Sequence, residues 1–133
     1  MYLLDTCVWL EALLGQEKAD EVRAFLGGAR PQELAITDFS LYSIALYLTR
    51  AKKDEVFADF LSDTVERSGV RVVRLTPADL IPVLGARKRH GLDFDDAYQY
   101  VAAKKYDYTF LSFDTDFDRT DLQRKTPGDI LNA

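Results

Sequence analysis

The sequence predicts an α/β domain in which a mostly parallel sheet of about five strands lies between two layers of helices. Three observations favour this three-layer α/β/α sandwich. Short apolar segments alternate along the chain with amphipathic segments of helical period. The segment "YTFLSF" at 108–113 lacks polar alternation, which is typical of a strand buried on both faces of a parallel sheet. The 133 residues contain no repeat or long linker, so we expect one domain over residues 1–133.

The first half of the chain contains two predicted strands. "YLLD" is expected to form a short buried strand that ends at Asp5, and "ELAIT" at 33–37 a second one. "EKADEVRAFLGG" at 17–28 is predicted to be a helix that Gly27-Gly28 stops, and "DFSLYSIALYLTRA" at 38–51 a helix with Asp38 as its N-cap. The apolar residues at helical spacing are Val22, Phe25 and Leu26 in the former, and Phe39, Tyr42, Leu46 and Tyr47 in the latter.

The second half continues the same alternation. The start of one helix is especially clear, because Thr76 is a suitable N-cap and Pro77 suits the first helical position. Gly91 is expected to end that helix. The expected elements are a helix at 54–69, a strand at 70–75, helices at 76–91 and from Asp93, the strand at 108–113, and a short strand near 124–126.

Composition narrows the class of protein. A hydrophobic content of 47% predicts a folded globular chain, and no apolar run is long enough to span a membrane. The start "MYLLDTCVWL" lacks a basic region and a cleavage signature, so we expect no signal peptide. The single Cys7 cannot form an internal disulfide, which favours a reducing cytoplasm. The net charge of −5 argues against general binding of polyanions by bulk charge.

Several aspartates map to one edge of the predicted sheet. Asp5 and Asp38 follow the first two strands, and Asp114 and Asp116 follow the strand at 108–113. Ligands of open parallel sheets bind beyond the carboxyl ends of the strands. A crossover helix runs antiparallel to the strands, so the first turn that carries Asp96 also lies at this edge. The sequence therefore brings carboxylates from separate segments together.

Gathered carboxylates repel one another unless a cation neutralises them, and hard oxygen ligands favour Mg²⁺ or Mn²⁺. No Cys/His spacing supports zinc, and no glycine-rich phosphate-binding motif is present. Individual aspartates also have simpler explanations that involve no metal. In one alternative, Asp93 is simply a helix N-cap and Asp96 simply interacts favourably with the first helical turn, and neither binds a metal. Asp95 should point about 100° away from Asp96 into solvent, and we expect Asp118 and Asp121 to be surface charges.

Three segments together resemble a PIN-domain ribonuclease, and in length most of all the toxin of a VapBC-type toxin–antitoxin pair. The segments are "YLLDTCVWLE", "LDFDDAYQYVAAKKYDYTFLSFDTDF" and "RKTPGDIL". The family has an Asp-Thr/Ser pair after its first strand, an Asp before a small residue in a late helix, and a Thr/Ser-x-Asp-x-Asp-Phe segment after a strand. The matching residues are Asp5-Thr6, Asp96-Ala97, and Ser112, Asp114 and Asp116.

One position departs from the family pattern. The family usually carries a Glu in the helix after the second strand, and Ser43 stands where that Glu would be. A hydroxyl in place of a carboxylate is expected to weaken metal binding. Asp38, upstream on the same helix, is one candidate to replace it. The alternatives are a site that works with fewer acids and a domain that has lost activity.

The resemblance implies a Mg²⁺- or Mn²⁺-dependent endoribonuclease that leaves a 5′-phosphate and a 3′-hydroxyl. It implies that Asp5, Asp96 and Asp114 hold the metal, with help from Asp116 or Asp38. Thr6, Ser112 and Ser43 would orient carboxylates or waters. Candidates to contact RNA phosphates are basic residues that could equally form solvated helix faces: Arg50, Lys52, Lys53, Arg87, Lys88 and Arg89.

The resemblance also implies partners. These are an RNA substrate, a cognate antitoxin that covers the acidic groove, and a second copy of the chain, because such toxins often dimerise. A catalytically impaired PIN-like module that binds RNA or protein is the main alternative, because of Ser43. A phosphoacceptor signalling domain fits less well. "LLDT" offers a single early Asp, and no Lys follows "FLSFD".

Overall fold

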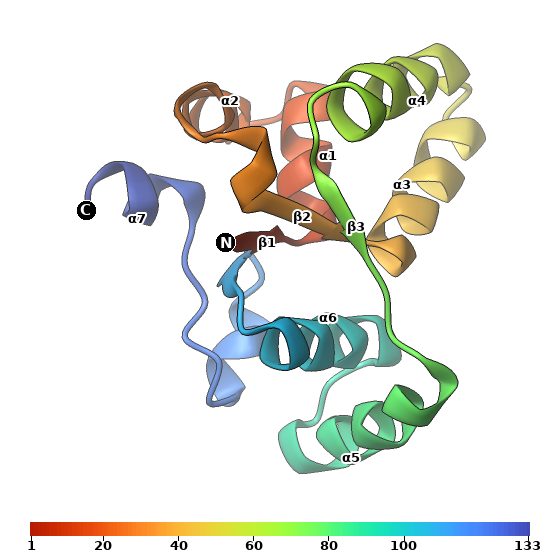
Figure 1. Cartoon of the computed structure of the whole chain (residues 1–133), viewed down its shortest axis with the longest axis vertical. Coiled ribbons are helices and arrows are strands. Elements are labelled where there is room, and N and C mark those ends of the chain that lie inside the picture. The colour runs from red at the N-terminus through yellow and green to blue at the C-terminus, as the bar shows by residue number, and fades with distance from the viewer.

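The sheet consists of parallel strands in the order β3-β2-β1-β4, in a computed structural model that describes residues 1–133 (Figure 1). Leu3 of β1 is in register with Ala35 of β2 and Phe110 of β4, so β1 lies in the middle of the sheet. The predicted α/β fold with a parallel sheet is confirmed. The strands are β1 (Tyr2–Leu4), β2 (Leu34–Thr37), β3 (Arg71–Val73) and β4 (Thr109–Leu111).

The expected strand near 124–126 is reduced to a single parallel bridge between Leu111 and Lys125. The Lys125 N–H donates to the Phe110 carbonyl at 2.9 Å, and the Lys125 carbonyl accepts from the Ser112 N–H at 3.0 Å. A longer strand cannot form, because the helical segment Pro127–Leu131 begins directly after Thr126. The Thr126 side chain caps this helix in a capping box with Asp129.

Helices cover both faces of the sheet, with α5 and α6 below it in Figure 1 and α1 to α4 above it. The helix at 6–14 and the short C-terminal helix have no clear amphipathic signal in the sequence and were not predicted from it. No helix combines the length and the apolar character that a membrane span needs. The helices are α1 (Thr6–Leu14), α2 (Ala19–Gly28), α3 (Asp38–Arg50), α4 (Asp54–Phe60), α5 (Leu80–His90), α6 (Phe94–Tyr106) and α7 (Pro127–Leu131).

Alternate strand residues feed two separate cores, one on each face of the sheet. Leu3 and Phe110 pack with residues of α5 and α6, whereas Leu4 and Leu111 pack with α1, α2, α3 and α4. All of these strand residues are buried. This two-sided burial explains why "YTFLSF" shows no polar alternation.

The buried line of α3 is not its aromatic stripe. Ser40, Ile44 and Leu48 face the core, whereas Tyr42 and Leu46 are 65% and 53% exposed. Tyr47 is also exposed. Both lines have helical spacing, so periodicity alone could not choose between them. The consequence is an exposed apolar face on the helix that borders the carboxyl edge of the sheet.

Helix boundaries agree with the expected caps in some places and correct them in others. Thr76 caps a 3₁₀ turn at Pro77–Asp79 that leads into α5, and Gly91 ends α5 with a φ of 65°, as expected. The cap of α3 is Thr37 and not Asp38, because the Thr37 side chain accepts from the Ser40 N–H. The predicted helix at 54–69 is divided into α4 and a π-helical segment at Leu61–Glu66.

Candidate active site

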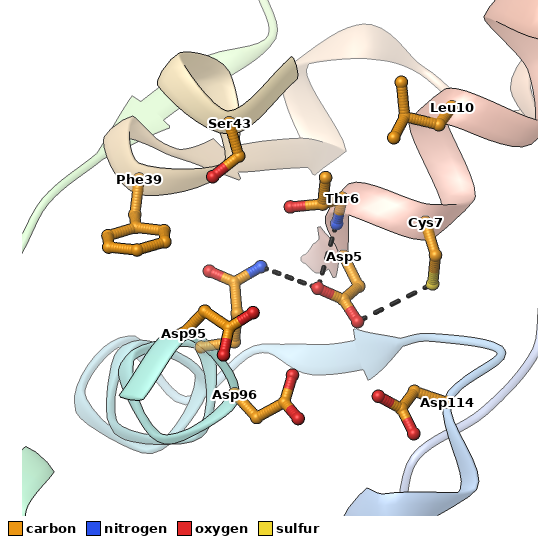
Figure 2. A pocket seen from close by; sticks show the side chains of 10 residues that line it. Asp5, Thr6, Cys7, Leu10, Phe39, Ser43, Asp95, Asp96 and Asp114 are labelled. Carbon is orange, nitrogen blue, oxygen red and sulfur yellow. Dashed lines mark hydrogen bonds between the residues drawn. The ribbon is translucent and has the colours of Figure 1, made fainter. Parts of the chain in front are cut away.

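A cavity of about 250 Å³ opens at the carboxyl edge of the sheet. Three chain segments bring an aspartate to it: the end of β1 brings Asp5, the first turn of α6 brings Asp96, and the segment after β4 brings Asp114 (Figure 2). The convergence expected from the parallel topology is therefore present. The lining residues are Asp5, Thr6, Cys7, Leu10, Phe39, Ser43, Asp95, Asp96, Gln99 and Asp114.

Asp5 is buried at 7% exposure and forms the N-cap of α1. Its Oδ1 accepts from the Thr6 N–H at 2.9 Å and from the Gln99 amide at 3.0 Å. Its Oδ2 accepts from the Ser112 hydroxyl at 2.7 Å and contacts the Cys7 thiol at 3.6 Å. Asp5 follows an apolar run, and this pattern does not indicate a capping role. The structure shows that capping and cavity lining coexist in one side chain.

The ionisation of Asp5 depends on two opposing effects. Burial raises the pKa of Asp5 above its ordinary value, whereas the hydrogen bonds from Ser112, Gln99 and Thr6 act to lower that pKa. An ionised carboxylate only accepts hydrogen bonds, and every one of these partners donates. The hydrogen bonds around Asp5 therefore favour the anion and partly offset the larger effect of burial.

Asp96 lies half-buried in the first turn of α6, with its carboxylate directed at the cavity (Figure 2). The pKa of Asp96 is raised to about 7, first by desolvation and then by the negative charges of Asp95, Asp114, Asp5 and Asp116. No hydrogen bond from the protein offsets these effects. In the absence of a cation, this carboxylate titrates near neutral pH.

Asp114 and Asp116 flank the start of a 3₁₀ turn at Thr115–Arg119. Asp114 caps this turn by accepting from the Asp116 N–H at 2.9 Å, while its own N–H donates to the Ser112 hydroxyl at 3.0 Å. Ligand oxygens of Asp96, Asp114 and Asp116 lie within 4.8 Å of one another. Asp116 is exposed and does not line the cavity, and its carboxylate pairs with Arg119 at 3.4 Å.

The donor set fits a hard divalent cation. Every charged group at the cavity is a carboxylate, no histidine is present there, and the thiol of Cys7 is neutral. Carboxylate oxygens are the ligands that Mg²⁺ and Mn²⁺ prefer. A bound cation would also remove the repulsion that raises the pKa of Asp96. Asp95 is exposed to solvent as expected, but it also lines the cavity and joins Asp93 and Asp96 in a second acidic group.

Asp38 does not join the acids at the cavity. Its Oδ1 accepts from the Tyr98 hydroxyl at 2.7 Å and from the Phe39 N–H at 2.8 Å, and its side chain lines a neighbouring pocket. Ser43 does line the cavity, in the position where the family pattern places a Glu. The α3 side of the cavity therefore presents a hydroxyl and no carboxylate.

The basic residues lie outside the cavity, exposed and without ion pairs. Arg50 lines a surface groove of about 520 Å³ with Ser43, Leu46 and Tyr47, so this groove adjoins the acidic cavity at Ser43. Arg89 lines a different groove between α5 and α6. The residues concerned are Arg50, Lys52, Lys53, Arg87, Lys88 and Arg89.

Two cavity residues were missed or underrated from the sequence. Gln99 lies one turn after Asp96 on α6, is 3% exposed, and donates to Asp5. Its spacing of three residues from Asp96 was the available signal. Cys7 is the other, and its half-buried side chain lines the cavity. Desolvation raises the pKa of Cys7 to about 12, so Cys7 stays a neutral thiol and not a nucleophile.

Comparison with known proteins agrees with this geometry. The sequence profile of the PIN domain family matches residues 2–122. Among curated proteins, none matches this chain.

Similar solved structures cover almost the whole chain. A structure of FitAB bound to an IR36 DNA fragment contains a chain with 19% identity and a TM-score of 0.82, over 96% of each chain. A toxin–antitoxin complex from Klebsiella pneumoniae gives 17% identity and a TM-score of 0.75, over 96% of this chain and 98% of that one. Mycobacterium tuberculosis VapC20, a sarcin–ricin loop cleaving toxin, has 17% identity and a TM-score of 0.80, over 96% of this chain and 100% of that one. At these identities the likeness establishes the fold.

Proposed function

This chain belongs to the PIN domain family, and from that premise we propose that it is a metal-dependent endoribonuclease and the toxin of a toxin–antitoxin pair. The single observation that carries the proposal is the convergence of Asp5, Asp96 and Asp114 on one cavity. The raised pKa of Asp96 supports it, because such a carboxylate is poised to accept a cation.

Asp96, Asp114 and Asp116, whose carboxylate oxygens lie within 4.8 Å of one another, would hold a Mg²⁺ or Mn²⁺ ion together with Asp5, which lines the same cavity as Asp96 and Asp114. Such an ion supplies Lewis acidity towards a phosphodiester and lowers the pKa of a bound water. The chain itself supplies the positioning. Ser112 and the Thr6 N–H hold Asp5, and the Asp114 N–H holds Ser112, so both sides of the cavity are fixed to the backbone.

An RNA substrate and an antitoxin are proposed from the similar structures. One of these is a sarcin–ricin loop cleaving toxin and another a toxin–antitoxin complex. The exposed side chains of Leu46 and Tyr47, together with Arg50, line a groove that adjoins the cavity. An antitoxin segment bound in this groove would cover the entrance for RNA. Homodimer formation stays a prediction.

The test is RNA cleavage by the purified protein with Mg²⁺ or Mn²⁺, using total RNA and a synthetic stem-loop as substrates. Asp5→Asn and Asp96→Asn should abolish cleavage, because each removes a carboxylate from the cavity. Asp59→Asn is the matched control, since Asp59 is an exposed acid on α4 without an ion pair. If the two cavity variants cut as fast as the wild type, the nuclease assignment is wrong.

A second candidate is a PIN-like module that binds RNA or protein without cleaving it. The observation in its favour is the α3 side of the cavity, where Ser43 offers no carboxylate and Asp38 is bound to Tyr98. Calorimetry with Mn²⁺ separates the two candidates. A folded protein that binds RNA but neither binds Mn²⁺ nor cleaves would be such a module.

A further inference from the structure

Gln99 lies at the centre of a buried hydrogen-bond network behind the acidic cavity. Its Oε1 accepts from the Thr37 hydroxyl at 2.7 Å. Its Nε2 donates to Asp5 Oδ1 at 3.0 Å and to the Ser40 hydroxyl at 2.8 Å. These partners come from β2, α3 and the end of β1, whereas Gln99 itself belongs to α6. One amide therefore ties the helix that carries Asp96 to the strand end that carries Asp5.

The hydrogen-bond partners of Gln99 define which way its amide points. The Ser40 N–H donates to Thr37 Oγ1 at 2.9 Å, and a backbone N–H can only donate. An ionised Asp5 carboxylate can only accept, so the Gln99 nitrogen faces Asp5. The Gln99 oxygen then faces Thr37, whose hydroxyl donates to it. A flipped amide would set two acceptors against each other at Asp5 and leave the Thr37 proton without a partner.

The same reasoning fixes the donor on the other oxygen of Asp5. The Asp114 N–H donates to Ser112 Oγ at 3.0 Å, and the Ser112 hydroxyl donates to Asp5 Oδ2 at 2.7 Å. Oδ1 thus accepts two hydrogen bonds, from the Gln99 amide and the Thr6 N–H. Oδ2 accepts one from Ser112 and has only a long contact of 3.6 Å with the Cys7 thiol. In Figure 2, the oxygen joined to Cys7 is the one on the side of Asp96 and Asp114. The oxygen of Asp5 with the weaker second contact therefore faces the other acids.

We propose that Gln99 is a positioning residue, which fixes the Asp5 carboxylate so that Oδ2 is presented to a divalent cation. The proposal rests on the nuclease function proposed above. Both polar atoms of the Gln99 amide are already bound to Thr37, Asp5 and Ser40. Gln99 acts by donating a hydrogen bond to Asp5 Oδ1 on the side away from the other acids. Thr37 in turn donates to the Gln99 oxygen and so holds the amide in one orientation. No carboxylate from α3 takes part, because Ser43 occupies that side of the cavity.

The test measures Mn²⁺ binding by calorimetry and, separately, kcat and KM for RNA cleavage. Gln99→Met keeps nearly the same volume but removes the donor, and it should weaken Mn²⁺ binding about 10- to 100-fold, the usual effect of losing such a supporting partner. Thr37→Val should weaken it less, because the amide stays but its orientation is no longer fixed. Thr37→Ser retains the hydroxyl and should restore the affinity. The loss in cleavage should appear in kcat and in the Mn²⁺ requirement, with KM for RNA unchanged.

Tyr106→Phe is the control for an ordinary lost hydrogen bond, since the Tyr106 hydroxyl donates to the Arg74 carbonyl away from the cavity. It should lower the melting temperature without changing Mn²⁺ affinity. If wild type binds Mn²⁺ and a folded Gln99→Met variant binds it within twofold as well, the positioning role is wrong while the nuclease function stands. If Gln99→Met does not fold, equal affinities of Thr37→Val and Thr37→Ser would refute the role. Wild-type protein that binds no Mn²⁺ would overturn both proposals.

Discussion

Desolvation of Asp96, together with its repulsion by the neighbouring acids, should make the metal-free protein more stable when Asp96 is replaced by Asn. The pKa of Asp96 is raised from 3.8 to about 7, and at about 1.4 kcal/mol per pKa unit this gives an upper limit of roughly 4 kcal/mol. Asp96 is only half-buried, so solvent screening reduces the expected gain at pH 8 to about 1–2 kcal/mol. For a domain of this size, that corresponds to a rise in Tm of roughly 3–8 °C.

The pH dependence follows from the sign of the shift. A carboxyl whose pKa is raised in the folded state binds its proton more tightly there than in the unfolded chain. Stability from Asp96 is therefore fully present below pH 3.8 and is lost as the pH rises to about 7. The gain from Asp96→Asn should be complete at pH 8 and less than half as large at pH 5. Comparing variant and wild type at each pH cancels the titration of the other acids.

The assay is thermal unfolding followed by circular dichroism, with EDTA or with Mn²⁺, and with Asp59→Asn as the exposed control. In EDTA at pH 8, Asp96→Asn should melt above the wild type. With saturating Mn²⁺ the order should reverse, because a ligand present at about 100 times its Kd stabilises the wild type by about 2.7 kcal/mol. A variant that melts below wild type in EDTA, or that shifts equally at pH 5 and pH 8, would refute this account of the cavity.

Three further variants test other parts of the site. Ser43→Glu should tighten Mn²⁺ binding and lower the Tm in EDTA, because it adds a carboxylate to the cavity; unchanged affinity in calorimetry would exclude a role for this position. Ser112→Ala removes the donor to Asp5 Oδ2 and should cost about 1–3 kcal/mol in urea unfolding; a cost near zero would mean that Oδ2 does not need this partner. Phe117→Ala empties a fully buried site against Phe110 and should cost about 3–5 kcal/mol, measured in the same way; a cost below about 1 kcal/mol would show that the core refills.

The convergence of the acids was predictable because it depends on topology and not on packing detail. Once strands alternate with helices, the ends of β1 and β4 and the start of α6 must meet at one edge. Asp5, Asp114 and Asp96 occupy those places in the sequence. The two-sided burial of β4 was predictable for the same kind of reason, since an unbroken apolar run fits only a covered strand.

The orientation of α3 was not predictable, because two of its lines of residues have helical spacing and both contain large apolar side chains. The choice depends on how the helix crosses the sheet, and the structure buries Ile44 and Leu48 and exposes Tyr42 and Leu46. The position of Asp38 was unpredictable for a related reason. Its carboxylate is held by the hydroxyl of Tyr98, which lies 60 positions away in the sequence.

The charge balance of the cavity favours an active enzyme over a binding module. A buried carboxylate such as Asp5 costs stability unless it is satisfied, and a neutral side chain of similar volume would avoid that cost. Here Gln99 and Ser112 both donate to Asp5 and so favour its ionised form, and the charges of Asp95 and Asp114 act on Asp96. A module that binds no cation gains nothing from these unfavourable contacts, whereas a cation site requires them. Ser43, in place of the expected Glu, lowers the charge repulsion at the cavity but leaves the hydrogen bonds of Asp5 intact. If the site binds a cation for catalysis, Mn²⁺ should stabilise the wild type against unfolding but should not stabilise Asp96→Asn.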